Sequence, residues 1–241
     1  MIAFFISISV FTAWLDNLIR DMYGVKPGVK LEGRDVSGML REEVKALVME
    51  MAMQEWRLPK EPELDKITGR IIPEEPGVTV DVLTTVNNIM HAQANQTVFL
   101  TRNSIPSKYR SEDLEGLKSI GAYSTYIYGS KQRSNNILLA SAAINNTVIW
   151  PNQVFSFNEV VGPRTPERGY EPAPVILMGA NNYDYGGGVC QVSSTVYNAA
   201  LEAKLKILER HPHSKPVHYV PKDRDAAVAY GGNDLRFLNQ T

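Results

Sequence analysis

The sequence predicts an α+β protein. Apolar residues at Val29 and Leu31 alternate with polar ones, as in a short strand. Apolar residues between Arg41 and Arg57 recur at helical spacing instead. The predicted apolar face of that helix comprises Val44, Leu47, Val48, Met51 and Ala52. Proline and glycine clusters then divide the chain, so we expect more than one folded part.

The composition is that of an ordinary globular protein. The chain has 241 residues, of which 44% are hydrophobic and 21% charged, enough for one or two domains. A net charge of -1 gives no general electrostatic footprint for nucleic acid, so no nucleic-acid partner is expected. The single cysteine excludes an internal disulfide and cysteine-rich zinc frameworks.

The N-terminal segment Met1–Leu15 is apolar and carries no charge. It is shorter than the roughly 20 residues of a membrane span and suits a secretory or signal-anchor segment better. We therefore expect residues 1–22 to act as a signal-anchor, with the protein at the outer face of the membrane. The alternative is an apolar helix packed on the following domain.

Residues 23–103 are expected to form a small α+β module, and residues 104–132 a linker. Asp81 is placed to cap the second helix of this module. The expected elements are strand Val29–Leu31, helix Arg41–Arg57, strands Ile67–Ile72 and Gly77–Val82, helix Val82–Ala94 and strand Thr97–Leu100.

Residues 133–241 are expected to form a second domain whose last predicted helix begins near Cys190. Apolar positions Val192, Val196, Ala199, Ala200 and Ala203 give that helix its buried stripe. The other expected elements are helix Arg133–Asn145 and strands Thr147–Trp150, Pro174–Met178 and Val217–Val220.

Cys190 follows the glycine run Gly186–Gly188 at the start of a predicted helix. The N–H groups and positive dipole end of a helix N-terminus favour the thiolate form of a cysteine placed there. A thiol nucleophile also needs a base and a group that orients the base. His213 is the expected base, with His211 as its competitor, and Asp225 is the expected orienting carboxylate. The alternative is an inert buried cysteine.

Other polar residues are candidates for binding rather than catalysis. Arg164 and Arg168 suit a carboxylate or phosphate, because guanidinium forms paired hydrogen bonds with such groups. Tyr170, Tyr183 and Tyr185 are candidates to line a cleft, although packing is the commoner role. Neither a metal motif nor a nucleotide-binding motif is present, so no metal or cofactor is expected. A zinc site at the histidines after the helix, His211, His213 and His218, remains an alternative.

The second half of the chain contains, in order, F-S-F-N, G-P-R-T, G-G-G-V-C-Q-V-S-S-T, Y-N-A-A-L, H-S, Y-V-P, D-A and D-L-x-F-x-N. This series resembles the VanW family of bacterial cell-envelope proteins. Within that pattern, H-S and D-A fall on His213-Ser214 and Asp225-Ala226. Lys204 departs from the pattern, because the family more often has glycine there. The chain ends soon after Asn239, so we expect a final strand or two of the domain to be missing.

The segment GVKLEGRDVSGM, followed later by GVTVDV, is similar to a peptidoglycan-binding module that often precedes VanW domains. The resemblance therefore implies a cell-wall protein with a link to vancomycin resistance, whose partner is peptidoglycan or its peptide stems. The expected substrate-binding residues are Arg164, Gly187, Gly188, Gln191, Ser193 and Ser194.

Two functions remain open on the sequence. The first is a thiol enzyme that transfers or hydrolyses an amide or ester bond, with Cys190, His213 and Asp225 as its catalytic residues. Their order along the chain, with cysteine at a helix start and histidine and aspartate at following strands, is that of transglutaminase-like and papain-like enzymes, a fold-level analogy. The second is a non-catalytic peptidoglycan-binding or envelope scaffold protein.

Overall fold

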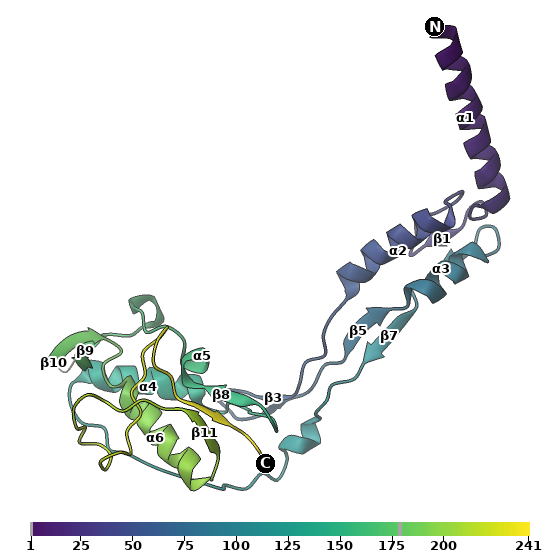
Figure 1. Ribbon diagram of the computed structural model, residues 1–241. Helices are drawn as coiled ribbons and strands as arrows, with labels where there is room; N and C mark the ends of the chain where they lie inside the picture. The colour runs from purple at the N-terminus through teal and green to yellow at the C-terminus, as the bar shows by residue number, and fades with distance from the viewer. Residues whose placement is uncertain (1, 178–179) are drawn as a thin grey trace. The chain divides into compact units, whose positions relative to one another are not determined.

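The computed structural model describes residues 2–177 and 180–241, and it divides into two compact units (Figure 1). Unit 1 comprises Met1–Pro62 and Pro73–Arg110, and unit 2 comprises Glu63–Ile72 and Ser111–Thr241. Met1 and Met178, which belong to two of the predicted segments, lie outside the described residues. Helices and several small sheets are mixed in both units, so the predicted α+β class is confirmed.

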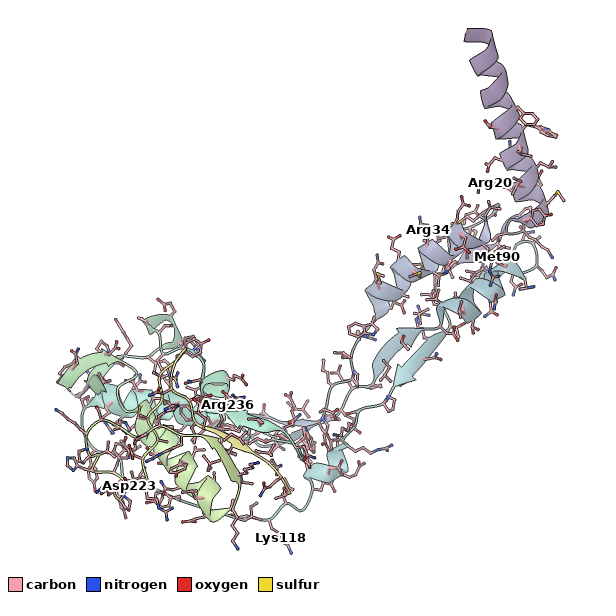
Figure 2. The ribbon with its side chains drawn as sticks, viewed as in Figure 1. Arg20, Arg34, Met90, Lys118, Asp223 and Arg236 are labelled. Carbon is pink, nitrogen blue, oxygen red and sulfur yellow. The ribbon has the colours of Figure 1, made fainter. Side chains whose placement is uncertain are left out.

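Unit 1 begins with helix α1 (Ile2–Tyr23), which is longer than the apolar segment seen in the sequence. Arg20, labelled in Figure 2, bridges Asp16 on the same helix and Glu43 on the next one, at 2.8 and 2.7 Å. Among the described residues, no helix has both the length and the apolar character needed to cross a membrane. Several described apolar side chains of α1 are exposed: Phe11, Trp14, Leu15, Leu18, Ile19, Met22 and Tyr23.

The rest of unit 1 packs two helices against short strands. Helix α2 (Arg41–Glu55) lies beside helix α3 (Val82–Met90), as Figure 1 shows. The side chain of Asp81 accepts a hydrogen bond from the Thr84 amide, so the predicted cap of α3 is confirmed. The strands are β1 (Lys30–Leu31), β2 (Arg34–Asp35), β5 (Gly77–Val80), β6 (Thr97–Val98) and β7 (Arg102–Ile105).

The predicted strand Ile67–Ile72 is wrong over most of its length. Only β4 (Ile71–Ile72) is extended, and it pairs with β3 (Glu63–Leu64) as a hairpin. The intervening chain turns because the Asp65 carboxylate accepts hydrogen bonds from the amides of Ile67 and Thr68 at 3.1 and 2.6 Å. Within the predicted linker, residues 104–105 belong to β7, and Ser111–Leu114 form a short 3₁₀ helix, η1.

Unit 2 combines three described α-helices with a three-stranded antiparallel sheet. Helix α4 (Lys131–Ile144) packs against helix α6 (Val189–Glu202) and the short helix α5 (Phe157–Val161). The sheet has the order β11–β12–β8, and a separate hairpin leads into α6. The remaining elements are β8 (Val154–Ser156), η2 (Pro166–Arg168), β9 (Pro172–Leu177), β10 (Ala180–Tyr185), β11 (Lys206–Glu209) and β12 (Arg236–Leu238).

The D-L-x-F-x-N segment has a structural role in unit 2. The buried Asp234 carboxylate accepts hydrogen bonds from Ser156 Oγ, the Asn158 amide and the Leu235 amide, at 2.6, 2.9 and 2.8 Å. Phe237 stacks on Phe155 with ring centroids 4.7 Å apart. These contacts join β12 to β8 and to the start of α5, the two elements that carry the F-S-F-N residues.

Two strands predicted in unit 2 are wrong. Residues 147–150 and 217–220 form irregular chain, and β11 occupies the sheet position next to β12 instead. Pro216 and Pro221 bracket the second segment and have no amide hydrogen to donate to a sheet, which accounts for its lack of pairing. The irregular path nevertheless matters, because it carries Tyr219 toward the start of α6.

Candidate functional site

Cys190 lies in the first turn of α6, as the sequence predicts. Gly188 is the N-cap residue of this helix, with a φ of 108° that other residues rarely adopt. A Cβ atom on Gly187 would lie only 2.5 Å from the carbonyl oxygen of Ala173, so β9 and the glycine run are in close contact. The glycines therefore have a packing role: they let the hairpin β9–β10 turn directly into α6.

The Cys190 thiol is half-buried and lies against the backbone of Val228. The Val228 amide donates to Sγ, and Sγ is equally close to the Val228 carbonyl oxygen, at 3.5 Å in both cases. The thiol is thus held in one position by main chain that follows Asp225.

The Asp225 carboxylate accepts hydrogen bonds from both His213 and Arg210. Its Oδ2 atom accepts hydrogen bonds from the His213 amide and from His213 Nδ1, both at 2.6 Å. Its Oδ1 atom accepts a hydrogen bond from Arg210 Nη2 at 2.8 Å. The His213 and Asp225 side chains are only 8% and 10% exposed, so the pair is shielded from solvent.

His213 also interacts with the Cys190 side chain, as the pKa of the imidazole shows. Burial by itself lowers the pKa of His213, but the interactions with Cys190 and then Asp225 outweigh burial and raise the pKa above its ordinary value. The pKa of Asp225 is lowered: burial opposes the shift, while the hydrogen bonds from His213 and the charge of Arg210 outweigh burial. The structure thus brings Cys190, His213 and Asp225 together in that spatial order.

His213 and Asp225 lie on irregular segments rather than on strands. In this respect the arrangement differs from the transglutaminase-like and papain-like order expected from the sequence. The contacts between the three side chains do not depend on strand pairing. Instead, hydrogen bonds between Ala226, the residue after Asp225, and helix α6 bring the three side chains together.

Ser193 and Ser194, two of the predicted substrate-binding residues, make those bonds. Both are fully buried, and Ser193 Oγ donates to the Ala226 carbonyl oxygen at 2.6 Å. The Ala226 amide donates to Ser194 Oγ at 2.8 Å. These hydroxyls hold the chain of Asp225 against the first turns of α6.

Gln191, another predicted substrate-binding residue, is also engaged within the fold. Its side chain is buried, accepts a hydrogen bond from Arg133 Nη2 at 2.6 Å, and donates to Thr125 Oγ1 at 3.0 Å and to the Tyr126 carbonyl oxygen at 2.8 Å. It thereby ties residues 125–126 to α4 and α6. The side chains of Gln191, Ser193 and Ser194 therefore hold the neighbouring chain segments in place around Cys190.

Tyr219 belongs to the site, although it is not among the residues that the sequence predicts there. Its ring meets the His213 ring edge-on, with centroids 6.4 Å apart. Burial raises the pKa of Tyr219 strongly, the charge of Cys190 adds to the effect, and a hydrogen bond with Ser194 opposes it. The phenol therefore stays protonated beside the thiol. Tyr219 is the tyrosine of the Y-V-P motif, which could have indicated a role for it, but the apolar pattern of this segment predicts a strand.

The two candidate arginines have different environments. Arg168 Nη1 donates to the carbonyl oxygens of Val161 and Pro163, at 2.7 and 2.8 Å, and so holds the turn after α5. Arg164 lies over the rings of Phe157 and Tyr230, 5.7 and 5.9 Å from their centroids. Its terminal nitrogens, Nη1 and Nη2, are buried and have no hydrogen-bond partner among the described residues.

The remaining candidates lie apart from these contacts. His211 Nε2 lies 3.0 Å from Glu209 Oε1, so the competing base is engaged elsewhere. Tyr170 is buried in the core of unit 2, whereas Tyr183 and Tyr185 are exposed on β10. Within the described part of the chain, no group of three histidine, cysteine or acidic side chains is arranged to hold a metal ion.

Comparison with known proteins shows where this domain belongs. Residues 132–241 match the family model described as VanW like protein. Uncharacterized protein YoaR of Bacillus subtilis (strain 168) is 45% identical over 153 residues, which cover 62% of this chain and 50% of that protein. Vancomycin B-type resistance protein VanW of Enterococcus faecalis (strain ATCC 700802 / V583) is 29% identical over 111 residues, which cover 44% of this chain and 40% of that protein.

No solved structure matches the chain. The matched segments span half or less of these two curated relatives. The family match covers the same residues as the series of sequence motifs in the second half of the chain. These residues also form the elements around α6. Residues 132–241 are therefore a VanW-family domain.

Proposed function

We propose that the VanW-family domain is a thiol-dependent acyl transferase or hydrolase of the cell envelope, acting on amide or ester bonds of peptidoglycan peptides. The observation that carries the proposal is the position of His213, which interacts with Cys190 on one side and with Asp225 on the other. A nucleophile, a base and a group that orients the base are the minimum for covalent catalysis by a thiol.

The reaction would proceed in two steps. Sγ of Cys190 attacks the carbonyl carbon of the substrate, and His213 takes the thiol proton. The C–N or C–O bond then breaks, His213 gives that proton to the leaving amine or alcohol, and a thioester forms on Cys190. In the second step water or an acceptor amine, deprotonated by His213, attacks the thioester and restores the thiol. No other reactant is needed.

The negative charge that develops on the substrate oxygen also needs hydrogen-bond donors. The Cys190 amide lies in the first turn of α6, where N–H groups have no acceptor within the helix. The Tyr219 phenol, kept protonated by burial and influenced by the charge of Cys190, is the second proposed donor. Donors that are held in place in advance lower the barrier, because they need no rearrangement during the reaction.

The envelope setting rests on the relatives. The name of one of them, Vancomycin B-type resistance protein VanW, connects the family with an antibiotic that acts on the cell wall. The N-terminal segment that is similar to a peptidoglycan-binding module supports the same setting, with unit 1 as a cell-wall binder. The proposed location is therefore the outer face of the cell, with peptidoglycan or its peptide stems as partner.

The test is incubation of the purified protein with soluble peptidoglycan fragments, with products identified by mass spectrometry. We expect cleaved or newly joined peptides with the wild-type protein and none with the Cys190→Ala variant, whose fold is checked by circular dichroism. Products that persist in Cys190→Ala would contradict the proposal. Tight binding of the fragments without any product would favour the alternative, a non-catalytic envelope scaffold.

A further inference from the structure

The side chain of Arg164 has donors that the fold leaves unused. It follows α5 in the G-P-R-T segment, and its two terminal nitrogens are buried without a hydrogen-bond partner among the described residues. Its guanidinium lies over the rings of Phe157 and Tyr230. A ring face attracts a cation but accepts none of its directed N–H bonds in the way a carboxylate does.

The carboxylate that acts on this cation is already occupied by other donors. Asp234 interacts electrostatically with Arg164, but its two oxygens accept hydrogen bonds from Ser156, Asn158 and Leu235. Burial accordingly lowers the pKa of Arg164, and the charges of Tyr170, Cys190 and Asp234 only partly offset this effect. A buried cation without a paired anion is costly, and a bound anion would offset that cost.

Arg164 packs on the glycine run that precedes the candidate nucleophile. A Cβ atom on Gly186 would meet the Arg164 side chain at 2.9 Å, and Gly186 is the first glycine of the run that leads to Cys190. The charge of Cys190 is also one of those that act on the guanidinium. An anion bound to Arg164 would therefore be part of the substrate that is attacked at Cys190.

We infer that Arg164 binds a free carboxylate of the substrate next to the scissile bond. Building on the proposed function, this makes the substrate class a peptide that is cut or transferred at its C-terminal residue rather than in its interior. The planar fork of arginine donors matches the two oxygens of a carboxylate. The Tyr230 ring lies over the guanidinium and is 58% exposed. The next residue is Gly231, whose φ is 76°. We therefore expect the exposed Tyr230 side chain to move aside when the ligand binds.

The test measures binding to the Cys190→Ala protein, in which no turnover can occur. The probes are N-acetyl-Lys-D-Ala-D-Ala with a free C-terminal carboxylate and the same peptide ending in an amide, compared by isothermal titration calorimetry. We expect the acid to bind at least about tenfold more tightly, as a charge-assisted pair of hydrogen bonds would give. Adding Arg164→Met should reduce this ratio to about one, and Arg164→Lys should retain part of it.

The matched control is Arg236→Met, which removes the same charge from an exposed arginine of unit 2, labelled in Figure 2. This control should keep the full preference for the acid. A third peptide, N-acetyl-Glu-D-Ala-D-Ala amide, has only a side-chain carboxylate. If this peptide binds as tightly as the acid, Arg164 recognises a carboxylate that does not mark the C-terminus, and the inferred substrate class is wrong.

Equal affinity for acid and amide, no binding of the acid, or a preference that survives Arg164→Met would each overturn the inference. The outcome is separable from that of the proposed function. A preference for the acid in a protein whose activity does not need Cys190 would contradict the enzyme mechanism alone. Cys190-dependent activity without such a preference would contradict the carboxylate site alone.

Discussion

His213 binds a single oxygen of Asp225 twice, once through its amide and once through Nδ1. Because the pKa of Asp225 is lowered, this oxygen belongs to a carboxylate, which can only accept hydrogen bonds. Nδ1 must therefore carry a proton, and Nε2 is left to face Cys190. The main chain and the side chain of His213 are thus oriented by the same group, and Arg210 holds that group from its other oxygen.

Replacing Asp225 by asparagine tests this orientation. The asparagine side chain in Asp225→Asn can present its NH₂ group to Nδ1, which favours the opposite tautomer and removes the negative charge that supports the imidazolium. We expect the rate of the Cys190-dependent reaction to fall by about 10²–10⁴-fold with little change in fold. The measurement is the initial rate of product formation, and Asp184→Asn, an exposed change on β10, serves as control. A rate within about twofold of wild type would contradict the assigned role of Asp225.

The raised pKa of His213 makes the stability of unit 2 depend on pH. A group whose pKa is higher in the folded state stabilises that state below its unfolded pKa of about 6.5 and loses this contribution as the pH rises through the folded value. The free energy of unfolding, from urea titrations at pH 6 and pH 9, should therefore fall over this range. The fall should be smaller in His213→Gln and unchanged in His218→Gln, whose side chain is exposed. Equal pH dependence in all three proteins would show that protonated His213 and its partners contribute nothing to the free energy of unfolding.

Lys204 has a left-handed backbone conformation at the C-terminal end of α6, and a substitution tests what this conformation costs. It follows the C-cap residue Ala203 and has a φ of 56°, in the left-handed region where glycine is preferred. This conformation favours glycine, the residue that the family resemblance leads us to expect at this position. Lys204→Gly should raise the free energy of unfolding by about 0.5–1 kcal/mol. Lys206→Gly, an exposed change within β11, should lower it instead, and stabilisation by neither change would contradict this explanation.

Asp234 is expected to be essential for the fold and not for the chemistry. Asp234→Ala would leave Ser156 Oγ and the amides of Asn158 and Leu235 without an acceptor in a buried region. We expect it to lower the free energy of unfolding by about 3–5 kcal/mol, as measured by urea denaturation. Asp184→Ala, on the exposed face of β10, should cost less than about 1 kcal/mol. Similar losses in the two variants would argue against this hydrogen-bond network.

Local sequence patterns predict the parts of the site that depend on local structure. The apolar stripe of α6 and the preceding glycines place Cys190 at a helix start, because helical periodicity is decided within a few turns. His213 and Asp225 follow from their order and from the family resemblance. The H-S motif already favours His213 over His211, and the structure adds that His211 lies against Glu209 instead.

The features that the sequence does not predict arise from tertiary contacts. Tyr219 lies in a segment whose pattern predicts a strand, because a local pattern alone does not reveal whether a partner strand exists. The unused donors of Arg164 depend on where Asp234 and Phe157 lie in the folded domain. The internal roles of Gln191, Ser193 and Ser194 likewise become visible only when residues 125–126 and Ala226 are seen beside α6.

The most direct test is the rate at which iodoacetamide alkylates Cys190 at pH 7, followed by mass spectrometry of the intact folded protein. Cys190 is the only cysteine, so the mass change reports on this residue alone. We expect rapid alkylation in the wild-type protein and a rate at least about tenfold lower in His213→Gln, with no change in His211→Gln. A thiol that stays unmodified in the folded protein, or that reacts equally fast without His213, would contradict this expectation.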